Sequence, residues 1–317
     1  MKKNNNEKFN FYDTDKHYNQ YSAYLKSIFK TKVYKITLDA GFSCPNRDGT
    51  LSDKGCIFCD DSGSYSQAQS SLLSVKEQLY EGIDKLKNSK FKAKKFISYF
   101  QAYTNTYKPV EELEKIYTQG LSHPDVVGIS IGTRPDCVDE RKLDLIASYT
   151  QNYLTWIEYG LQTIHNRTLK LINRGHDFEC FLKTYEKTKQ RGINTCVHLI
   201  LGLPNETRED MLETVKTIAD LKVDGVKFHL LCAMKGTALE QMYYDGKYTP
   251  LEEKEYVSLL CDCLELLPSS TVIQRLAGNG LVGQTVAPKW LQKKFEILNR
   301  LDEEFIKRNS YQGCKYK

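Results

Sequence analysis

The chain has 317 residues, of which 40% are apolar and 27% are charged, with a net charge of +5 and ten cysteines. This composition excludes a disordered or fibrous protein, and the length favours one large domain with extensions. Because no run of about 18 apolar residues is present and no apolar segment follows the first lysines, we expect a cytoplasmic protein without a signal peptide or membrane partner, whose cysteines do not form a disulfide framework.

The N-terminal extension, residues 1–32, is basic and aromatic. The first 35 residues contain eight lysines and three acidic residues, so their net charge of +5 equals that of the whole chain. Lysines that alternate with tyrosines and phenylalanines can bind phosphates and offer stacking faces to bases. The alternative is a lysine-rich extension that packs its aromatic side chains on the core.

Six short apolar runs follow, separated by longer helical patterns. The runs are residues 33–40, 96–103, 126–133, 153–162, 195–204 and 225–234. Helix start signals lie between them: the capping box of Ser74 with Glu77, then Pro109, then Thr207 with Asp210. Strands that alternate with helices are parallel, so the predicted fold class is α/β, with either a partial (β/α)6 barrel or a doubly wound sheet.

One face of the predicted strands is polar, because successive residues of a strand point to opposite faces. The polar residues on this face include Gln101, Ser130, Glu158, His198, Lys227 and His229. A strand buried on both faces would be almost purely apolar, since an unpaired buried charge costs several kcal/mol. The pattern therefore predicts a barrel whose cavity holds a ligand. The alternative is a structural hydrogen-bonded network, for instance between Glu158 and Lys227.

The loop after the first strand holds three cysteines, Cys44, Cys56 and Cys59. Loops at the carboxyl ends of parallel strands form the active sites of α/β proteins, so these thiols lie over the same mouth as the polar face. A structural zinc site lacks a fourth ligand at finger-like spacing, and a thioredoxin-like pair leaves one thiol without a role. Three thiolates can hold three irons of a [4Fe-4S] cluster and leave the fourth iron open. Zinc completed by a distant residue remains an alternative.

This loop resembles the cluster loop of radical S-adenosylmethionine (SAM) enzymes, in which an aromatic residue commonly precedes the last cysteine, as Phe58 does here. The resemblance spans about residues 30–285 and includes "GISIGTRPDC", "WIEYGLQT", "INRGHD" and "HLILGLPNET". It implies a [4Fe-4S] cluster and SAM, whose reductive cleavage gives a 5′-deoxyadenosyl radical that abstracts hydrogen from a substrate. One motif departs from the family: after the second strand, Gln101 offers a neutral amide oxygen where a carboxylate often receives the SAM amino group.

The resemblance also implies which residues bind SAM. Glu158 would hold the ribose hydroxyls, with Gln162 as a weaker candidate, and Arg174 would pair with the SAM carboxylate. Ile200 would lie against the adenine, with His229 nearby.

A C-terminal α/β extension, residues 236–317, is expected to complete the barrel core at residues 33–235. Its predicted elements are a helix that ends before Pro268, a strand at 271–278 and a last helix from about Pro288 to Arg308. Arg275, in that strand, can meet a substrate phosphate or a carboxylate of the fold. Together with His198 and Lys227, it is a candidate for substrate contact.

The resemblance is to a bacterial subgroup related to the Elongator catalytic subunit, and it implies a tRNA substrate. Gram-positive members resemble enzymes that convert wobble 5-carboxymethylaminomethyluridine to 5-aminomethyluridine. The expected partners are tRNA, an electron donor such as flavodoxin or ferredoxin, and a downstream tRNA methyltransferase. The basic extension and residues 289–300 would bind phosphates while a flipped-out base enters the barrel. The alternatives are a radical SAM enzyme that acts on a small metabolite or inserts sulfur, and a non-catalytic, zinc-stabilised RNA-binding protein.

Overall fold

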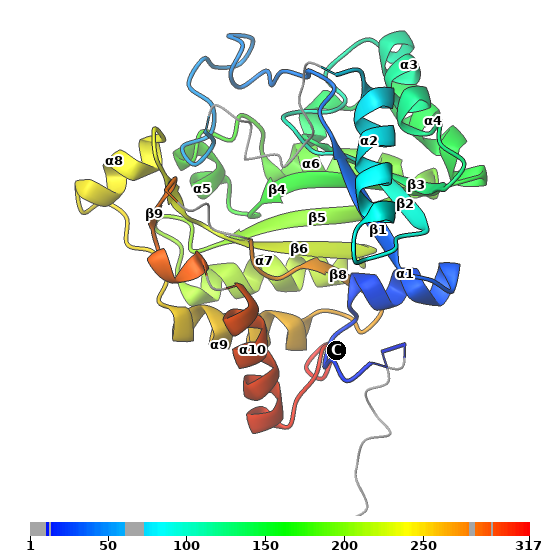
Figure 1. The fold of residues 1–317 in the computed structure, drawn as a ribbon. Helices are drawn as coiled ribbons and strands as arrows, with labels where there is room; N and C mark the ends of the chain where they lie inside the picture. Colours follow the sequence, from blue (N-terminus) through cyan, green and yellow to red (C-terminus); the bar gives the residue numbers. More distant parts are fainter. Residues whose placement is uncertain (1–10, 13, 61–72, 279–282, 293) are drawn as a thin grey trace, which may run out of the picture.

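A sheet of seven parallel strands forms the centre of the protein. The structure is a computed structural model that describes residues 11–317 except 13, 61–72, 279–282 and 293. The strands are β1 (Val33–Leu38), β2 (Lys95–Phe100), β3 (Val126–Thr133), β4 (Leu154–Gln162), β5 (Asn194–Leu201), β6 (Gly225–Leu230) and β8 (Val272–Arg275). They lie in the sheet in chain order (Figure 1). A doubly wound sheet reverses its strand order, so this unreversed order makes a half-barrel and confirms the predicted α/β barrel.

Helices pack on the outer face of the half-barrel, and their start signals are those expected. The helices that follow the strands are α2 (Val75–Asn88), α3 (Val110–Gly120), α4 (Glu140–Ser148), α6 (Phe178–Gln190) and α7 (Arg208–Asp220), with α9 (Glu253–Leu266) beside α7. The predicted capping boxes at Ser74 and Thr207 are both formed. Outward-facing strand residues such as Leu38, Phe100 and Ile131 are fully buried in the main hydrophobic core. The polar residues of the same strands therefore face the inside of the half-barrel.

The remaining elements lie between and after the strands. They are η2 (Pro135–Cys137), η3 (Tyr149–Gln151), α5 (Asn166–Leu171), β7 (Ala233–Met234), α8 (Ala238–Tyr244), β9 (Thr285–Ala287), η4 (Lys289–Gln292) and α10 (Lys294–Arg308). The run predicted as one strand at 225–234 is divided, because β6 ends at Leu230 and β7 pairs antiparallel with β9 outside the barrel sheet. The strand predicted at 271–278 is β8, which pairs with β6 and becomes the seventh strand of the barrel.

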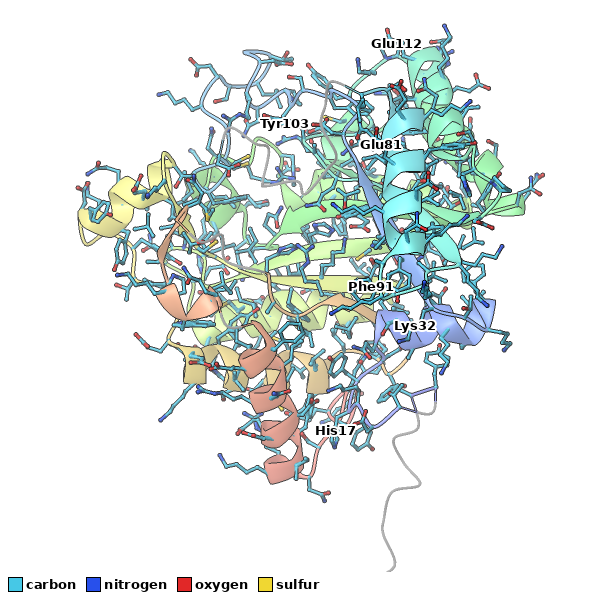
Figure 2. All side chains as sticks on the ribbon, in the orientation of Figure 1. His17, Lys32, Glu81, Phe91, Tyr103 and Glu112 are labelled. Carbon is cyan, nitrogen blue, oxygen red and sulfur yellow. The ribbon has the colours of Figure 1, made fainter. Side chains whose placement is uncertain are left out.

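The N-terminal helix α1 (Tyr21–Phe29) closes one end of the half-barrel. Tyr21 is 8% exposed and packs edge to face on Trp156 of β4, with ring centroids 5.9 Å apart. Because α1 precedes β1, it lies at the opposite end of that strand from the cysteine loop. Lys32 and Tyr103 mark the two ends in Figure 2. The alternative of aromatic packing on the core thus holds for Tyr21 and also for Tyr18, which is 4% exposed.

Two further expectations concern the chain as a whole. None of the helices in the described part of the chain is long and apolar enough to cross a membrane. The domain boundaries at residues 32 and 235 stay a prediction. Beyond residue 235, β8 belongs to the same sheet as the barrel strands.

Candidate active site

The cysteine loop is folded by local backbone hydrogen bonds that turn its three thiols toward one cavity. The Cys44 carbonyl accepts from the Arg47 amide at 2.8 Å, and the Cys56 carbonyl accepts from the Cys59 amide at 3.0 Å. Between these turns Gly55 has a φ of +70°, a left-handed conformation that glycine adopts without strain. All three cysteines line the same cavity, and none of them forms a disulfide with another described residue. The structure therefore brings together the three cysteines that the sequence selects.

The distances between the three thiols bear on which metal they could hold, a single zinc ion or a [4Fe-4S] cluster. Ligands of one tetrahedral zinc ion lie about 3.8 Å apart, because each Zn–S bond is about 2.3 Å. Within the described residues, the trio of potential metal ligands whose atoms all lie within 4.8 Å of one another is His165, Asp210 and Glu213, not the cysteines. Three thiols spread around one cavity fit a larger body such as a [4Fe-4S] cluster better than a single ion.

Two side chains place N–H groups beside the Cys56 sulfur. Arg174 Nη1 lies 3.6 Å from Cys56 Sγ, while its Nε and Nη2 donate to the Gly160 carbonyl at 3.0 and 2.6 Å. Asn46 Nδ2 lies 3.5 Å from the same sulfur. Arg174 is predicted from sequence, whereas Asn46 is not. These donors can stabilise a thiolate that coordinates iron.

Arg134 is a second guanidinium in the cavity wall, and it is not among the site residues predicted from the sequence. It is 2% exposed and makes two hydrogen bonds to Asp136, at 2.9 and 2.8 Å. Its Nη1 is buried without a hydrogen-bond partner in the described structure. Burial acts to lower the pKa of Arg134, but Asp136 and the thiols of Cys44 and Cys56 raise it above its ordinary value. The signal in the sequence was its place, directly after β3 at the mouth.

The predicted SAM-binding residues lie in or beside this cavity. Phe58, Gln101 and Gln162 line it, and Gln162 has a φ of +80° that turns the chain after β4. Among the described residues, no group hydrogen-bonds to the Gln162 side-chain amide, so it is available to a ligand. Ile200 is 7% exposed and belongs to a small apolar cluster against which Phe58 packs. Ile200 therefore supports the wall behind Phe58 and does not itself line the cavity.

Glu158 is the centre of a buried polar network at the inner end of the cavity. It is fully buried, and both of its oxygens accept hydrogen bonds. The donors are Lys35 (3.1 Å), Tyr99 (3.1 Å), His198 (2.8 Å), Ser130 and Lys227. Burial acts to raise the pKa of Glu158, but Lys227, Lys35 and His198 hold it well below its usual range. The structural network named as the alternative for Glu158 and Lys227 is thus present, and the ribose role of Glu158 stays a prediction.

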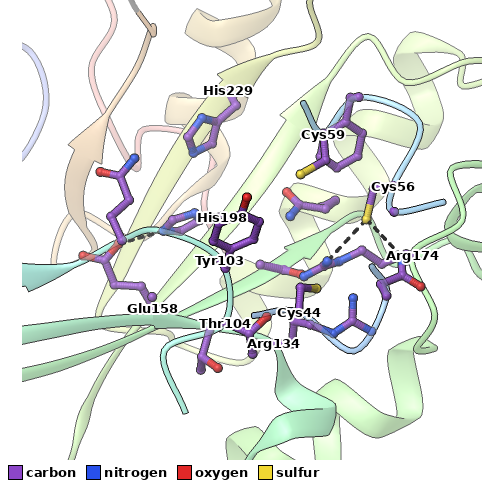
Figure 3. Close-up of a pocket in the computed structure, with 18 of the residues that line it drawn as sticks. Cys44, Cys56, Cys59, Tyr103, Thr104, Arg134, Glu158, Arg174, His198 and His229 are labelled. Atoms are coloured by element: carbon purple, nitrogen blue, oxygen red, sulfur yellow. Dashed lines mark hydrogen bonds and ion pairs between the residues drawn. The ribbon is translucent and has the colours of Figure 1, made fainter. Parts of the chain in front are cut away.

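Two histidines and Arg275 complete this inner end. The rings of His198 and His229 are 5.2 Å apart, and both residues line the cavity with Arg275. Burial and the charge of Lys227 lower the pKa of His198 to about 4, and burial and Arg275 lower that of His229 well below its ordinary value, so both rings are neutral at pH 7. Figure 3 shows His198, His229 and Glu158 on one side of the cavity and Cys56, Cys59 and Arg174 on the other.

Comparisons with known proteins agree with this geometry. A family model described as the Radical SAM superfamily matches residues 48–218, and a Radical SAM C-terminal domain model matches residues 223–307. The uncharacterized protein YtqA of Bacillus subtilis is 42% identical over 308 residues, 97% of this chain and 95% of that protein. A tRNA uridine(34) acetyltransferase of Methanocaldococcus infernus is 30% identical over 164 residues, 51% of this chain and 30% of that protein. A solved structure of M. infernus Elp3, 18% identical, covers 88% of this chain and 64% of that one with a TM-score of 0.67, which shows a shared fold.

Proposed function

We propose that this chain, which belongs to the radical SAM superfamily of enzymes, converts 5-carboxymethylaminomethyluridine to 5-aminomethyluridine at the wobble position of tRNA. The observation that carries the proposal is one cavity lined by the three cysteine thiols, by Arg174 and by the polar face of the sheet. The family implies a [4Fe-4S] cluster and SAM, which when bound supply a 5′-deoxyadenosyl radical. The substrate must therefore bring an abstractable hydrogen atom into this cavity.

Different residues around the cavity would bind the cluster and SAM. The three cysteines would hold the cluster, and Arg174, beside the Cys56 thiol, would pair with the SAM carboxylate. Gln162 has an unengaged amide for the ribose hydroxyls, whereas the oxygens of Glu158 already accept five hydrogen bonds, from the donors named above. Phe58 offers an apolar face for the adenine. We therefore place the ribose nearer Gln162 than Glu158.

Two features support a tRNA substrate. The chain is similar over 51% of its length to a protein named tRNA uridine(34) acetyltransferase. Helix α1 and Trp156 close the end of the half-barrel opposite the cysteine loop, so a substrate enters from the mouth. A single flipped-out base, extended by its 5-substituent, can enter such a cavity from one side.

The reaction removes the carboxymethyl group by oxidation at its CH₂ carbon. Loss of one hydrogen atom would leave a carbon radical between the nitrogen and the carboxylate, and removal of one further electron would give an iminium ion; the cluster that Cys44, Cys56 and Cys59 would hold is the group able to accept that electron. Water then adds to this carbon and the C–N bond breaks, which yields the protonated amine of 5-aminomethyluridine and glyoxylate.

The proposal extends to partners and location. The amine product suits a downstream tRNA methyltransferase, and the cluster needs an electron donor such as flavodoxin or ferredoxin. We propose that the reaction takes place in the cytoplasm, where tRNA and these partners would be available. We propose phosphate contact for residues 289–300, in which the described basic residues Lys289 and Arg300 are exposed, whereas Tyr18 and Tyr21 of the N-terminal extension are buried and so do not offer stacking faces.

The test is a reconstitution with defined tRNA. Anaerobically purified protein is incubated with SAM, a chemical reductant and tRNA that carries 5-carboxymethylaminomethyluridine, and the nucleosides are then identified by mass spectrometry. We expect 5-aminomethyluridine, glyoxylate and 5′-deoxyadenosine in equal amounts. The matched control is the Cys56→Ala variant, which should form none of them.

Two outcomes would reject this substrate. Unchanged nucleosides together with full SAM cleavage would show a radical enzyme with another substrate, such as a small metabolite or a sulfur acceptor. Protein that holds zinc and leaves SAM intact would favour the RNA-binding alternative. Either result would leave the fold and the cavity as described.

A further inference from the structure

The inner end of the cavity carries more positive than negative charge. Of the described residues at this end, Lys35, Lys227 and Arg275 are cations and Glu158, which pairs with both lysines, is the carboxylate, so the net charge is +2. Lys35 and Lys227 both contact Glu158. The two neighbouring histidines are neutral and add no charge. Buried charge of one sign is costly unless a counter-charge is present.

Of these three cations, Arg275 is the one without a hydrogen-bond or ion-pair partner among the described residues. It lines the cavity, and in the described part of the chain no side chain or carbonyl forms a hydrogen bond or ion pair with it. Glu158 cannot serve Arg275 as well, because both of its oxygens already accept hydrogen bonds from other donors. A guanidinium with free N–H groups inside a barrel is suited to bind a carboxylate through two parallel hydrogen bonds.

A β-bulge in β8 brings the side chain of Gln274 to the same inner end of the cavity as Arg275. Lys227 of β6 pairs with Arg275 of β8 and Val226 with Ile273, so Gln274 is the extra residue between them. Its Oε1 accepts from Lys35 at 3.0 Å, which leaves its Nε2 buried without a partner among the described residues. The bulge lets consecutive residues, Gln274 and Arg275, both face inward.

His229 adds a third unsatisfied group. Its Nε2 is buried and has no hydrogen-bond partner in the described residues. Buried polar atoms without partners cost about 1–3 kcal/mol each, and natural proteins keep few of them unless a ligand or water completes the set. Arg275, Gln274 and His229 come from neighbouring strands at one end of one cavity.

We propose that Arg275, with His229 and Gln274 beside it, binds the carboxylate of the substrate at the inner end of the cavity. The inference rests on the proposed function, in which the 5-substituent of a flipped-out base ends in a carboxylate. A phosphodiester of RNA joins two nucleotides and stays at the mouth, whereas a terminal carboxylate can reach the closed end near Trp156. Arg275 then selects the substrate over the product, because 5-aminomethyluridine has lost the carboxylate.

The first experiment measures binding with no turnover. Anticodon stem-loop RNAs that carry either 5-carboxymethylaminomethyluridine or 5-aminomethyluridine are titrated into the SAM-loaded, unreduced holoenzyme. We expect Arg275→Gln to weaken binding of the carboxylated RNA about 10- to 100-fold and to leave the aminomethyl RNA unchanged, with Arg275→Lys in between. Arg141→Gln, at an exposed arginine paired with Glu111, is the matched control and should change neither affinity. Equal effects on both RNAs, or none, would overturn the proposal.

The second experiment separates the carboxylate site from the tRNA reaction. Sarcosine (N-methylglycine) and methyl phosphate are used as minimal probes in saturation-transfer NMR with the holoenzyme and with the same variants. A sarcosine signal that disappears in Arg275→Gln supports the site even if tRNA is left unmodified, in which case only the proposed function fails. Preference for methyl phosphate, or wild-type tRNA modification by Arg275→Gln, would reject the carboxylate site and leave the tRNA proposal standing.

Discussion

Arg174 and Cys56 meet at the mouth of the half-barrel, where Arg174 Nη1 lies 3.6 Å from Cys56 Sγ although 118 positions separate the residues in sequence. Cys56 follows β1 and Arg174 follows β4, so the contact forms because the carboxyl ends of parallel strands share one edge. The same guanidinium is anchored by the Gly160 carbonyl through two hydrogen bonds. One cation therefore contacts both the cysteine loop and the sheet.

Replacing Arg174 should weaken SAM binding more than cluster binding. Arg174→Gln removes the charge that would pair with the SAM carboxylate, and charged hydrogen bonds contribute about 1.5–3 kcal/mol. We expect the Kd for SAM to rise about 10- to 100-fold, measured by equilibrium dialysis on anaerobic protein, with iron content retained. Loss of iron with unchanged SAM affinity in the remaining holoenzyme would contradict this role.

A methyl group at Gly160 should disturb the SAM site without unfolding the protein. A Cβ placed there would lie 2.8 Å from Arg174 Nη2 and 2.8 Å from Gln162 Nε2, and both are ends of flexible side chains that can move away. We expect Gly160→Ala to fold normally and to bind SAM more weakly. Gly128→Ala is the contrasting variant, because its Cβ would lie 2.5 Å from the backbone carbonyl of Leu154 and should lower the melting temperature. A lowered melting temperature in Gly160→Ala, together with an unchanged one in Gly128→Ala, would contradict this geometry.

Glu158 should be required for stability. Glu158→Gln leaves Lys35 and Lys227 without their counter-charge, and breaking a buried ion pair in this way costs about 3–5 kcal/mol. The free energy of unfolding, measured by urea denaturation, should fall by that amount. A second substitution, Lys227→Met in the Glu158→Gln background, should recover part of the loss. A single variant as stable as the wild type would show that the network is not structural.

Stability should decrease as the pH falls from about 6.5 to about 4. The pKa of His198 is about 4 in the folded protein, where burial and Lys227 disfavour the charged ring, and about 6.5 in the unfolded chain. Between these values the unfolded chain binds the proton and the folded chain does not, so protonation favours unfolding, by on the order of 3 kcal/mol at the lower limit. Urea denaturation at several pH values should show this decrease in the free energy of unfolding. His198→Asn should make the dependence on pH weaker. The dependence that remains in this variant is expected to come from His229. An identical slope in that variant would exclude His198 as a source.

Much of the fold and of the site follows from local patterns in the sequence. The two-residue period of the strands assigned Glu158, His198 and Lys227 to one inward face, and the structure joins all three in one network. The position of the cysteine loop after the first strand placed the thiols over that face. Both inferences depend only on strand geometry and on the direction of parallel strands.

Other features depend on contacts between distant segments and could not be predicted. The place of Arg134 directly after β3 indicates that it lies at the mouth, but its burial beside the thiols of Cys44 and Cys56 depends on how the cysteine loop packs against that strand end, which the sequence does not show. The β-bulge at Gln274 depends on how β8 pairs with β6, which periodicity does not encode. For the same reason the sequence could not decide whether Tyr21 stacks on bases or, as the structure shows, packs edge to face on Trp156.

The most direct test of the central claim is the iron content and SAM cleavage of anaerobically prepared protein. The wild type should bind about four iron atoms per chain and release 5′-deoxyadenosine on reduction, while Cys44→Ala, Cys56→Ala and Cys59→Ala should each lose both properties. Cys314→Ala, at an exposed thiol, is the matched control and should keep them. Iron-poor wild-type protein, or deoxyadenosine production by any of the three variants, would contradict a cluster held by these cysteines.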